Sequence, residues 1–125
     1  MKRNIITILS VLFVSLQSFS STSGKNDVYL QLLKTSLQVT VRNNLGNLEE
    51  GAAVKLYKTD EDYRNDTNLV AKATTDDKGR AKFTELAPTI YYLDVRKGDM
   101  NNFGAGIKTD SLVEKRMNKV TIIIE

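Results

Sequence analysis

The chain alternates apolar and polar residues from Ser36 onward, which is the pattern of a β-strand with one buried face. In "LQVTVRN", the apolar residues Leu37, Val39 and Val41 fall on one face, and the polar residues between them fall on the other. This spacing predicts a half-buried strand at the start of the folded region.

Five more runs of the same kind follow. They are "LEEGAAVKLYKT" with Val54 and Leu56 inward, "LVAKATT", "RAKFTEL" with Ala81 and Phe83 inward, "IYYLDVRK" with Tyr91, Leu93 and Val95 on one face, and "KVTIIIE" with Val120, Ile122 and Ile124 on one face. A further short strand is expected near residues 107–109. The turn-forming sequences "NLGN" and "DDKG" separate neighbouring runs. Residues 36–125 are therefore predicted to form an all-β, antiparallel sandwich of about seven strands.

Two polar stretches interrupt the strands. Residues 60–68, "DEDYRNDTN", are expected to be a solvated connection, and residues 98–106, "GDMNNFGAG", are rich in glycine and asparagine. No long helical pattern follows the first 20 residues, so both stretches are interpreted as loops.

The N-terminus has the layout of a secretory signal. Lys2 and Arg3 precede an apolar run of about 12 residues, which is short for a bilayer-spanning helix of about 20 residues. Residues 1–20 are predicted to be a signal peptide, with an uncleaved membrane anchor as the alternative. Residues 21–35 fit either an added strand or a helical turn. After cleavage, no stable membrane span is expected.

Composition narrows the location and the partners. The chain has no cysteine, so it offers neither a disulfide nor a lipobox cysteine, and a secreted or periplasmic bacterial protein is favoured. Its 18 basic and 15 acidic side chains become 16 and 15 once Lys2 and Arg3 are removed, a balance of +1. No basic run interleaved with aromatic residues is present, so no nucleic-acid partner is expected.

Residues 36–98 resemble the carboxypeptidase regulatory-like domains and their prealbumin-like (transthyretin-like) relatives, including the collagen-adhesin B-type repeats. The matching residues are Gly51, Ala52, Val54, Leu56, Thr75, Asp76, Gly79, Ala81, Phe83, Leu86, Tyr92 and Val95. The resemblance implies an Ig-like or prealbumin-like sandwich. It carries little information on function, because such modules occur as accessory domains in many surface and secreted proteins.

The chemistries of these relatives do not fit the chain. The 5-hydroxyisourate hydrolases that the chain is similar to in fold class use histidines and a C-terminal Tyr-Arg-Gly-Ser signature, whereas this chain has no histidine and ends "VTIIIE". The B-type repeats often form a Lys-Asn isopeptide bond from an inward lysine on the first strand, where this chain has Leu37, Val39 and Val41. Without histidine or cysteine, no enzyme activity is expected.

Candidate binding residues lie in the two polar stretches. Asp60, Asp62 and Asp66 offer hard oxygen ligands for calcium, although a solvated loop without a metal is the favoured interpretation, because the spacing matches no EF-hand and Arg64 lies in the middle. In residues 98–106, a protein partner would be contacted by Asn101, Asn102 and Phe103, since an aromatic residue in a loop has little local core to join.

The function expected from the sequence is that of a secreted, non-catalytic module for protein-protein interaction, adhesion or cell-envelope assembly. A calcium- or carbohydrate-binding module is the alternative, and no other cofactor is expected. The terminal strand offers an edge with which a partner strand can pair. Two short sequences match glycosylation motifs, with Asn65 and Ser111 as acceptors, but motifs this short also arise by chance.

Overall fold

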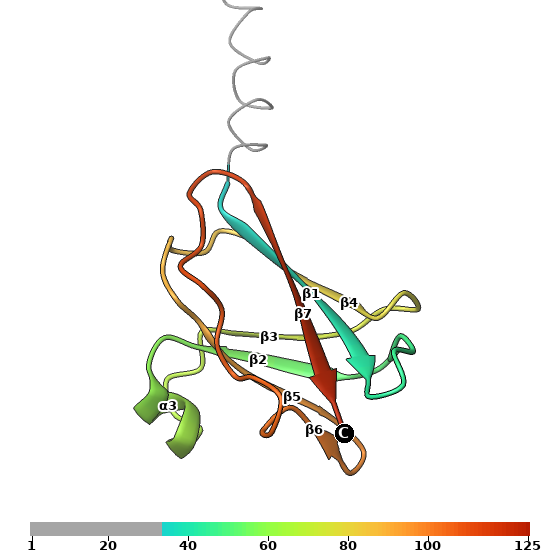
Figure 1. The fold of residues 1–125 in the computed structure, drawn as a ribbon. Coiled ribbons are helices and arrows are strands. Elements are labelled where there is room, and N and C mark those ends of the chain that lie inside the picture. Colours follow the sequence, from blue (N-terminus) through green and yellow to red (C-terminus); the bar gives the residue numbers. More distant parts are fainter. Residues whose placement is uncertain (1–33) are drawn as a thin grey trace, which may run out of the picture. The chain divides into compact units, whose positions relative to one another are not determined.

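The computed structural model describes residues 34–125, which form a sandwich of two β-sheets (Figure 1). One sheet has the order β4-β1-β7 and the other has the order β3-β2-β5-β6. The strands are β1 (Ser36–Asn43), β2 (Ala53–Tyr57), β3 (Ala71–Thr74), β4 (Arg80–Phe83), β5 (Tyr92–Lys97), β6 (Met100–Asn101) and β7 (Met117–Ile124). The predicted all-β sandwich of about seven strands is confirmed. The predicted signal peptide, residues 1–20, and most of the ambiguous segment 21–35 lie outside the described residues.

Alternation along the strands produces the core. The buried apolar side chains come from both sheets and from the segment before β7: Leu37, Val39, Val41, Ala52, Val54, Leu56, Ala81, Phe83, Tyr91, Leu93, Val95, Leu112, Ile122 and Ile124. Each fully buried Val, Leu or Phe contributes roughly 1.5–3 kcal/mol relative to exposure. Because residues 34–125 contain no cysteine, these contacts hold the two sheets together without a disulfide.

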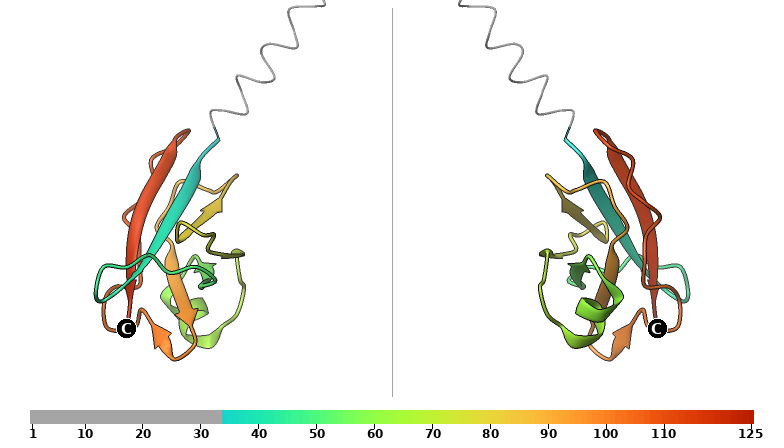
Figure 2. Two further views of the ribbon diagram at one scale, coloured as in Figure 1. Left: turned by 90° about the vertical axis from the view of Figure 1, so that its right-hand side faces the viewer. Right: turned by 90° about the vertical axis from the view of Figure 1, so that its left-hand side faces the viewer.

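β7 pairs with β1 in parallel, whereas the other pairs are antiparallel. The reason lies in the connection that follows β6. It runs back along the start of β5, where Leu93 N donates to Ile107 O (2.6 Å) and Thr109 N donates to Tyr91 O (2.9 Å). The chain thus returns to the end of the sandwich where β1 begins, and β7 then runs in the same direction as β1. In Figure 2, β1 lies between β7 and β4.

The predicted loop 60–68 contains a short helix, α3 (Asp60–Asn65), so its interpretation as an entirely irregular connection was wrong. Thr59 is the N-cap, and its hydroxyl accepts a hydrogen bond from Asp62 N (3.0 Å). Three acidic residues lie in the first turn, where their negative charges stabilise the helix because its N-terminal end carries partial positive charge. Asp66 ends the helix in the left-handed conformation, with φ 52°.

The connection after β5 also differs from the expectation. Met100 and Asn101 form the two-residue strand β6, which pairs with Arg96 and Lys97. Near residues 107–109, where a short strand was expected, the structure has a single bridge between Tyr92 and Lys108. Of the described helices, none has the length and apolar character that crossing a membrane requires.

Candidate binding surface on the four-stranded sheet

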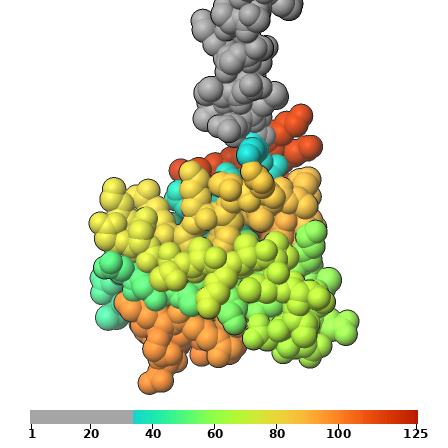
Figure 3. Space-filling model, turned by 180° about the vertical axis from the view of Figure 1, so that it is seen from behind, coloured from blue at the N-terminus to red at the C-terminus, as the bar shows by residue number. Residues whose placement is uncertain are grey.

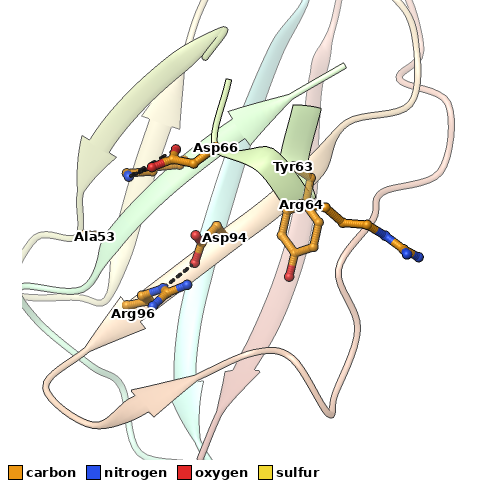
Figure 4. A pocket seen from close by; sticks show the side chains of 7 residues that line it. Ala53, Tyr63, Arg64, Asp66, Asp94 and Arg96 are labelled. Carbon is orange, nitrogen blue, oxygen red and sulfur yellow. Dashed lines mark hydrogen bonds and ion pairs between the residues drawn. The ribbon is translucent and has the colours of Figure 1, made fainter. Parts of the chain in front are cut away.

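Polar and aromatic side chains gather on the outer face of β2 and β5. Lys55 and Tyr57 on β2 lie opposite Asp94 and Tyr92 on β5, because strand register places directly opposite residues on the same face. α3 packs against both strands, and it and the β5–β6 region lie on one side of the molecule (Figure 3). Their side chains enclose a hollow of about 280 Å³, lined by Ala53, Lys55, Tyr63, Arg64, Asp66, Asp94 and Arg96 (Figure 4).

A hydrogen bond between Tyr57 and Asp66 ties the end of α3 to the sheet. The buried Tyr57 hydroxyl donates to the Asp66 carboxylate, and Lys55 Nζ lies 3.5 Å from the same carboxylate. This hydrogen bond, followed by the charge of Lys55, lowers the pKa of Asp66. Burial, reinforced by the carboxylate, raises the pKa of Tyr57. Asp66 is therefore ionised and Tyr57 neutral at physiological pH.

Asp94 and Arg96 form the second polar pair of the hollow. Arg96 Nε donates to Asp94 Oδ1 at 2.8 Å. The Asp94 side chain is 10% exposed, and the Arg96 side chain is 58% exposed. Asp94 raises the pKa of the Arg96 guanidinium, which stays charged. The same guanidinium lies 4.9 Å from the centroid of the Phe103 ring, within range of a cation–π interaction.

Tyr63 on α3 joins the aromatic side chains of this surface. Its ring centroid lies 6.1 Å from that of Tyr57, 6.4 Å from that of Tyr92 and 6.3 Å from that of Phe103. Its hydroxyl is buried, and among the described residues it has no hydrogen-bond partner. Burial raises the pKa of Tyr63, so the hydroxyl carries a proton that it can donate. A buried donor without a partner favours a ligand or a water at this position.

The carboxylates of the hollow already have partners. Asp66 accepts a hydrogen bond from Tyr57, and Asp94 accepts one from Arg96. Arg64 and Arg96 present their charges toward solvent, and Figure 4 shows Arg64 directed away from the sheet. The surface thus offers two cations, a fixed aromatic ring and a buried hydroxyl.

The structure gives each carboxylate of the predicted calcium site a different partner. Asp60 pairs with Arg64 (2.9 Å), Asp62 accepts hydrogen bonds from Asn68 (2.9 Å) and Thr67, and Asp66 accepts from Tyr57. Within residues 34–125, no three acidic side chains are grouped closely enough to hold a metal ion. Calcium binding at Asp60, Asp62 and Asp66 stays a prediction, and it requires these partners to be released.

The predicted partner-binding residues occupy three different environments. Asn102 is fully buried, and its side chain bonds Val95 N (3.0 Å) and Leu93 O (2.9 Å), so proposing it as a surface contact was wrong. Asn101 is half-buried, and its backbone pairs with that of Glu125. Phe103 is 51% exposed, and it packs against Tyr63 instead of standing alone at a loop tip.

Sequence reasoning did not identify Tyr57, Tyr63, Asp94 and Arg96 as neighbours. A partial signal was available for Asp94 and Arg96, since they alternate with core residues and so must share the outer face of β5. The strand pattern gives no such indication for Tyr63, because the position of this residue depends on how α3 packs on the sheet.

The first strand, β1 of the three-stranded sheet, differs from that of the isopeptide-forming repeats in the residues that it buries. Leu37, Val39 and Val41 are buried at the first-strand positions where those repeats carry the lysine. Lys55 lies on the outer face, beside Asp66. Among residues 34–125, the buried side chains include no lysine.

Comparison with known proteins defines the class of fold. No family model matches the sequence, and no curated protein matches it. Among solved structures, the chain is similar to a Streptococcal ancillary pilin (TM-score 0.56, 17% identity, 74% of this chain and 32% of that chain). It is also similar to BcpA, the major pilin subunit of Bacillus cereus (0.51, 16%, 74% and 30%), and to GBS52, the minor pilin of Streptococcus agalactiae (0.50, 15%, 73% and 44%).

These similarities concern the fold alone, because the identities are low. The described chain has the β-sandwich fold found within pilin subunits, and it spans less than half the length of those proteins. The comparison therefore defines the fold of this chain and not its function.

Proposed function

We propose that this protein is a secreted, non-catalytic β-sandwich module of the bacterial cell envelope, related to the carboxypeptidase regulatory-like and prealbumin-like domains. In this function it contacts a protein partner in adhesion or envelope assembly. The similarity in fold to pilin domains supports this proposal, as does the secretory layout of residues 1–20.

The observation that carries the proposal is the arrangement of Phe103 and Arg96 beside the hollow. A half-exposed aromatic ring held between Tyr63 and a guanidinium loses little side-chain entropy when a partner covers it. Aromatic and arginine side chains of this type supply most of the binding energy in many protein interfaces. The partner surface is expected to carry carboxylates that face Arg64 and Arg96.

Site-specific photocrosslinking in the native host tests this surface. A photoreactive residue replaces Arg64, which is exposed beside the hollow, and in a matched control it replaces Lys78, which is exposed in the turn between β3 and β4. We expect one reproducible envelope or secreted protein to be crosslinked from position 64 and not from position 78. Phe103→Ala introduced together with the position 64 probe should abolish the product.

Equal crosslinking from both positions, or none from position 64 while the probe is exported and reactive, contradicts the proposed contact surface. Detection of turnover that is lost in Asp94→Asn would contradict the non-catalytic function.

Carbohydrate binding is a second candidate, favoured by the buried hydroxyl of Tyr63 beside the Asp94–Arg96 pair. Planar charged groups next to aromatic rings are common at sugar sites, since they donate and accept hydrogen bonds in one plane while a ring covers the apolar face of the sugar. Titration calorimetry with envelope glycans, compared between the wild type and Tyr63→Phe, tests this function. Binding that is weakened by loss of the hydroxyl supports it.

A further inference from the structure

The strand β7 lies at an edge of its sheet, and its outward backbone groups follow a clear alternation. Ser36 N donates to Arg116 O (3.0 Å), so the even-numbered residues of this segment bond toward β1. Glu125, an odd-numbered residue, instead exchanges two backbone hydrogen bonds with Asn101 on the other side (3.0 and 3.1 Å). The odd-numbered residues of β7 therefore direct their backbone groups away from β1.

The outward groups of β7 form one continuous stretch. Met117, Lys119, Thr121 and Ile123 present their N–H and C=O groups there, and within residues 34–125 none of these groups is hydrogen-bonded to another segment. The turn at residues 114–116 bounds the stretch at one end, and the Asn101–Glu125 pair bounds it at the other. In Figure 2, β7 forms the outer side of its sheet.

This edge has little of the protection that edge strands usually have. Such strands are commonly shortened, bulged, or interrupted by charges and proline. β7 is eight residues long and has no proline, and Lys119 is its one charged residue. Its residues Val120, Thr121, Ile122, Ile123 and Ile124 are β-branched and favour extended pairing. Met117 is 39% exposed. The strand has the properties of an interface.

We propose that β7 pairs antiparallel with β7 of a second copy of this chain, which joins the two three-stranded sheets into one. The pairing is centred on Val120, so that Met117 faces Ile123 of the second copy and Lys119 faces its Thr121. This register satisfies all the outward groups with roughly eight hydrogen bonds, and it ends on both sides where the unpaired stretch ends. A two-fold axis makes the contact closed and self-limiting.

The charges near the edge are compatible with a second copy. In this register, no two like charges lie directly opposite each other along β7. The basic turn of one copy, Lys115 and Arg116, approaches the end of β7 in the other copy, where Glu125 is exposed. Opposite charges thus meet at both ends of the paired strands. The Lys119 side chains lie diagonally across the pair, where their repulsion is weak and is screened by salt.

The proposal is independent of the binding surface on the other sheet. The hollow beside α3 is built on β2 and β5, whereas the proposed contact uses β7, and no residue that lines the hollow belongs to β7. A result at one surface therefore does not decide the other.

Sedimentation velocity on the protein purified from its native host tests the proposal. We expect a reversible dimer whose population rises with protein concentration. Thr121→Pro removes an outward N–H while leaving the hydrogen bonds to β1 in place, so it should weaken the dimer at least tenfold. Met117→Lys should weaken it as well, and the matched control Leu45→Lys, in the exposed turn after β1, should not.

A disulfide trap tests the register. The chain has no cysteine, so Val120→Cys introduces a single thiol that lies opposite its own counterpart in the second copy. We expect oxidation to crosslink this variant quantitatively, and the control Leu45→Cys to stay monomeric.

Several results would overturn the proposal. One is a wild type that sediments as a monomer at about 100 µM, a concentration at which strand-mediated dimers with micromolar dissociation constants form. Another is a dimer that survives both Thr121→Pro and Met117→Lys while circular dichroism shows each variant to be folded. A third is occupation of the β7 edge by a different protein, lost in Thr121→Pro, because the partner would then not be a second copy.

Discussion

At the scale of single residues, Gly79 shows how a close backbone approach restricts the sequence. It lies in the turn before β4 with φ +70°, and an added Cβ would come within 2.9 Å of Val41 O and 3.2 Å of Glu49 N. Both contacts are backbone atoms, and they are held in place by a hydrogen bond that Glu49 N donates to Val41 O (2.9 Å). The side chain of Asp76 completes the turn by accepting hydrogen bonds from Lys78 N and Arg80 N.

We therefore expect Gly79→Ala to lower the free energy of unfolding by about 2–4 kcal/mol, from left-handed strain and from the clash. Gly51→Ala is the matched control, since Gly51 has φ +78° but open space around its Cβ position, and it should cost about 1 kcal/mol. Urea denaturation of both variants measures the difference. Equal losses would contradict the effect of the close approach.

The hydrogen bond between Tyr57 and Asp66 should make stability depend on pH. The folded-state pKa of Asp66 is lowered, chiefly by this bond, so its stabilisation is present above the ordinary aspartate pKa and is lost as the pH falls through the folded-state value. Tyr57→Phe should therefore lower the melting temperature at pH 7, and the difference from the wild type should shrink as the pH falls below the ordinary aspartate pKa.

Carboxyl NMR measures the same coupling directly, because Tyr57→Phe should raise the pKa of Asp66 toward its ordinary value. A pKa of Asp66 that is unchanged by the substitution would show that the hydroxyl does not stabilise the carboxylate.

At the scale of elements, the N-cap Thr59 stabilises the start of α3, and the hydrogen bond from Tyr57 to Asp66 ties its end to the sheet. Thr59→Ala removes the hydroxyl that accepts from Asp62 N, and it should cost about 1 kcal/mol of stability. Thr59→Ser keeps the hydroxyl and should cost little. The cap acts locally on α3, which carries Tyr63. In the alanine variant, backbone amide hydrogen exchange at residues 60–66 should therefore accelerate more than exchange in the core strands. Uniform acceleration of all strands would contradict a local role.

At the scale of the whole molecule, stability rests on contacts between the two sheets. Leu56 is fully buried, and Leu56→Ala should lower the free energy of unfolding by about 2–5 kcal/mol, a large share of the roughly 5–15 kcal/mol typical of a domain. Leu45, at 82% exposure, is the control, and Leu45→Ala should change it by no more than about 0.5 kcal/mol. Comparable losses in both variants would contradict this description of the core.

The sequence by itself determined six of the seven strands, all except β6, and the face that each of the six buries. Leu37, Val54, Phe83 and Tyr91 were all assigned inward by the period of two, and all are buried, because side-chain alternation is a local property of extended backbone. Gly79 ends the predicted turn sequence "DDKG", and its φ is positive, as such turns commonly require of a glycine. Turn chemistry of this kind also depends only on neighbouring residues.

Only the tertiary structure decided what covers the outer face of the four-stranded sheet and which edge of the other sheet is unpaired within residues 34–125. The position of Tyr63 over Tyr92, the burial of Asn102 and the parallel pairing of β7 with β1 all depend on contacts between residues far apart in the sequence. A polar residue in a loop has the same local pattern whether it is solvated or bonds the backbone of a distant strand. Both the candidate binding surface and the open edge of β7 arise from packing that local periodicity does not record.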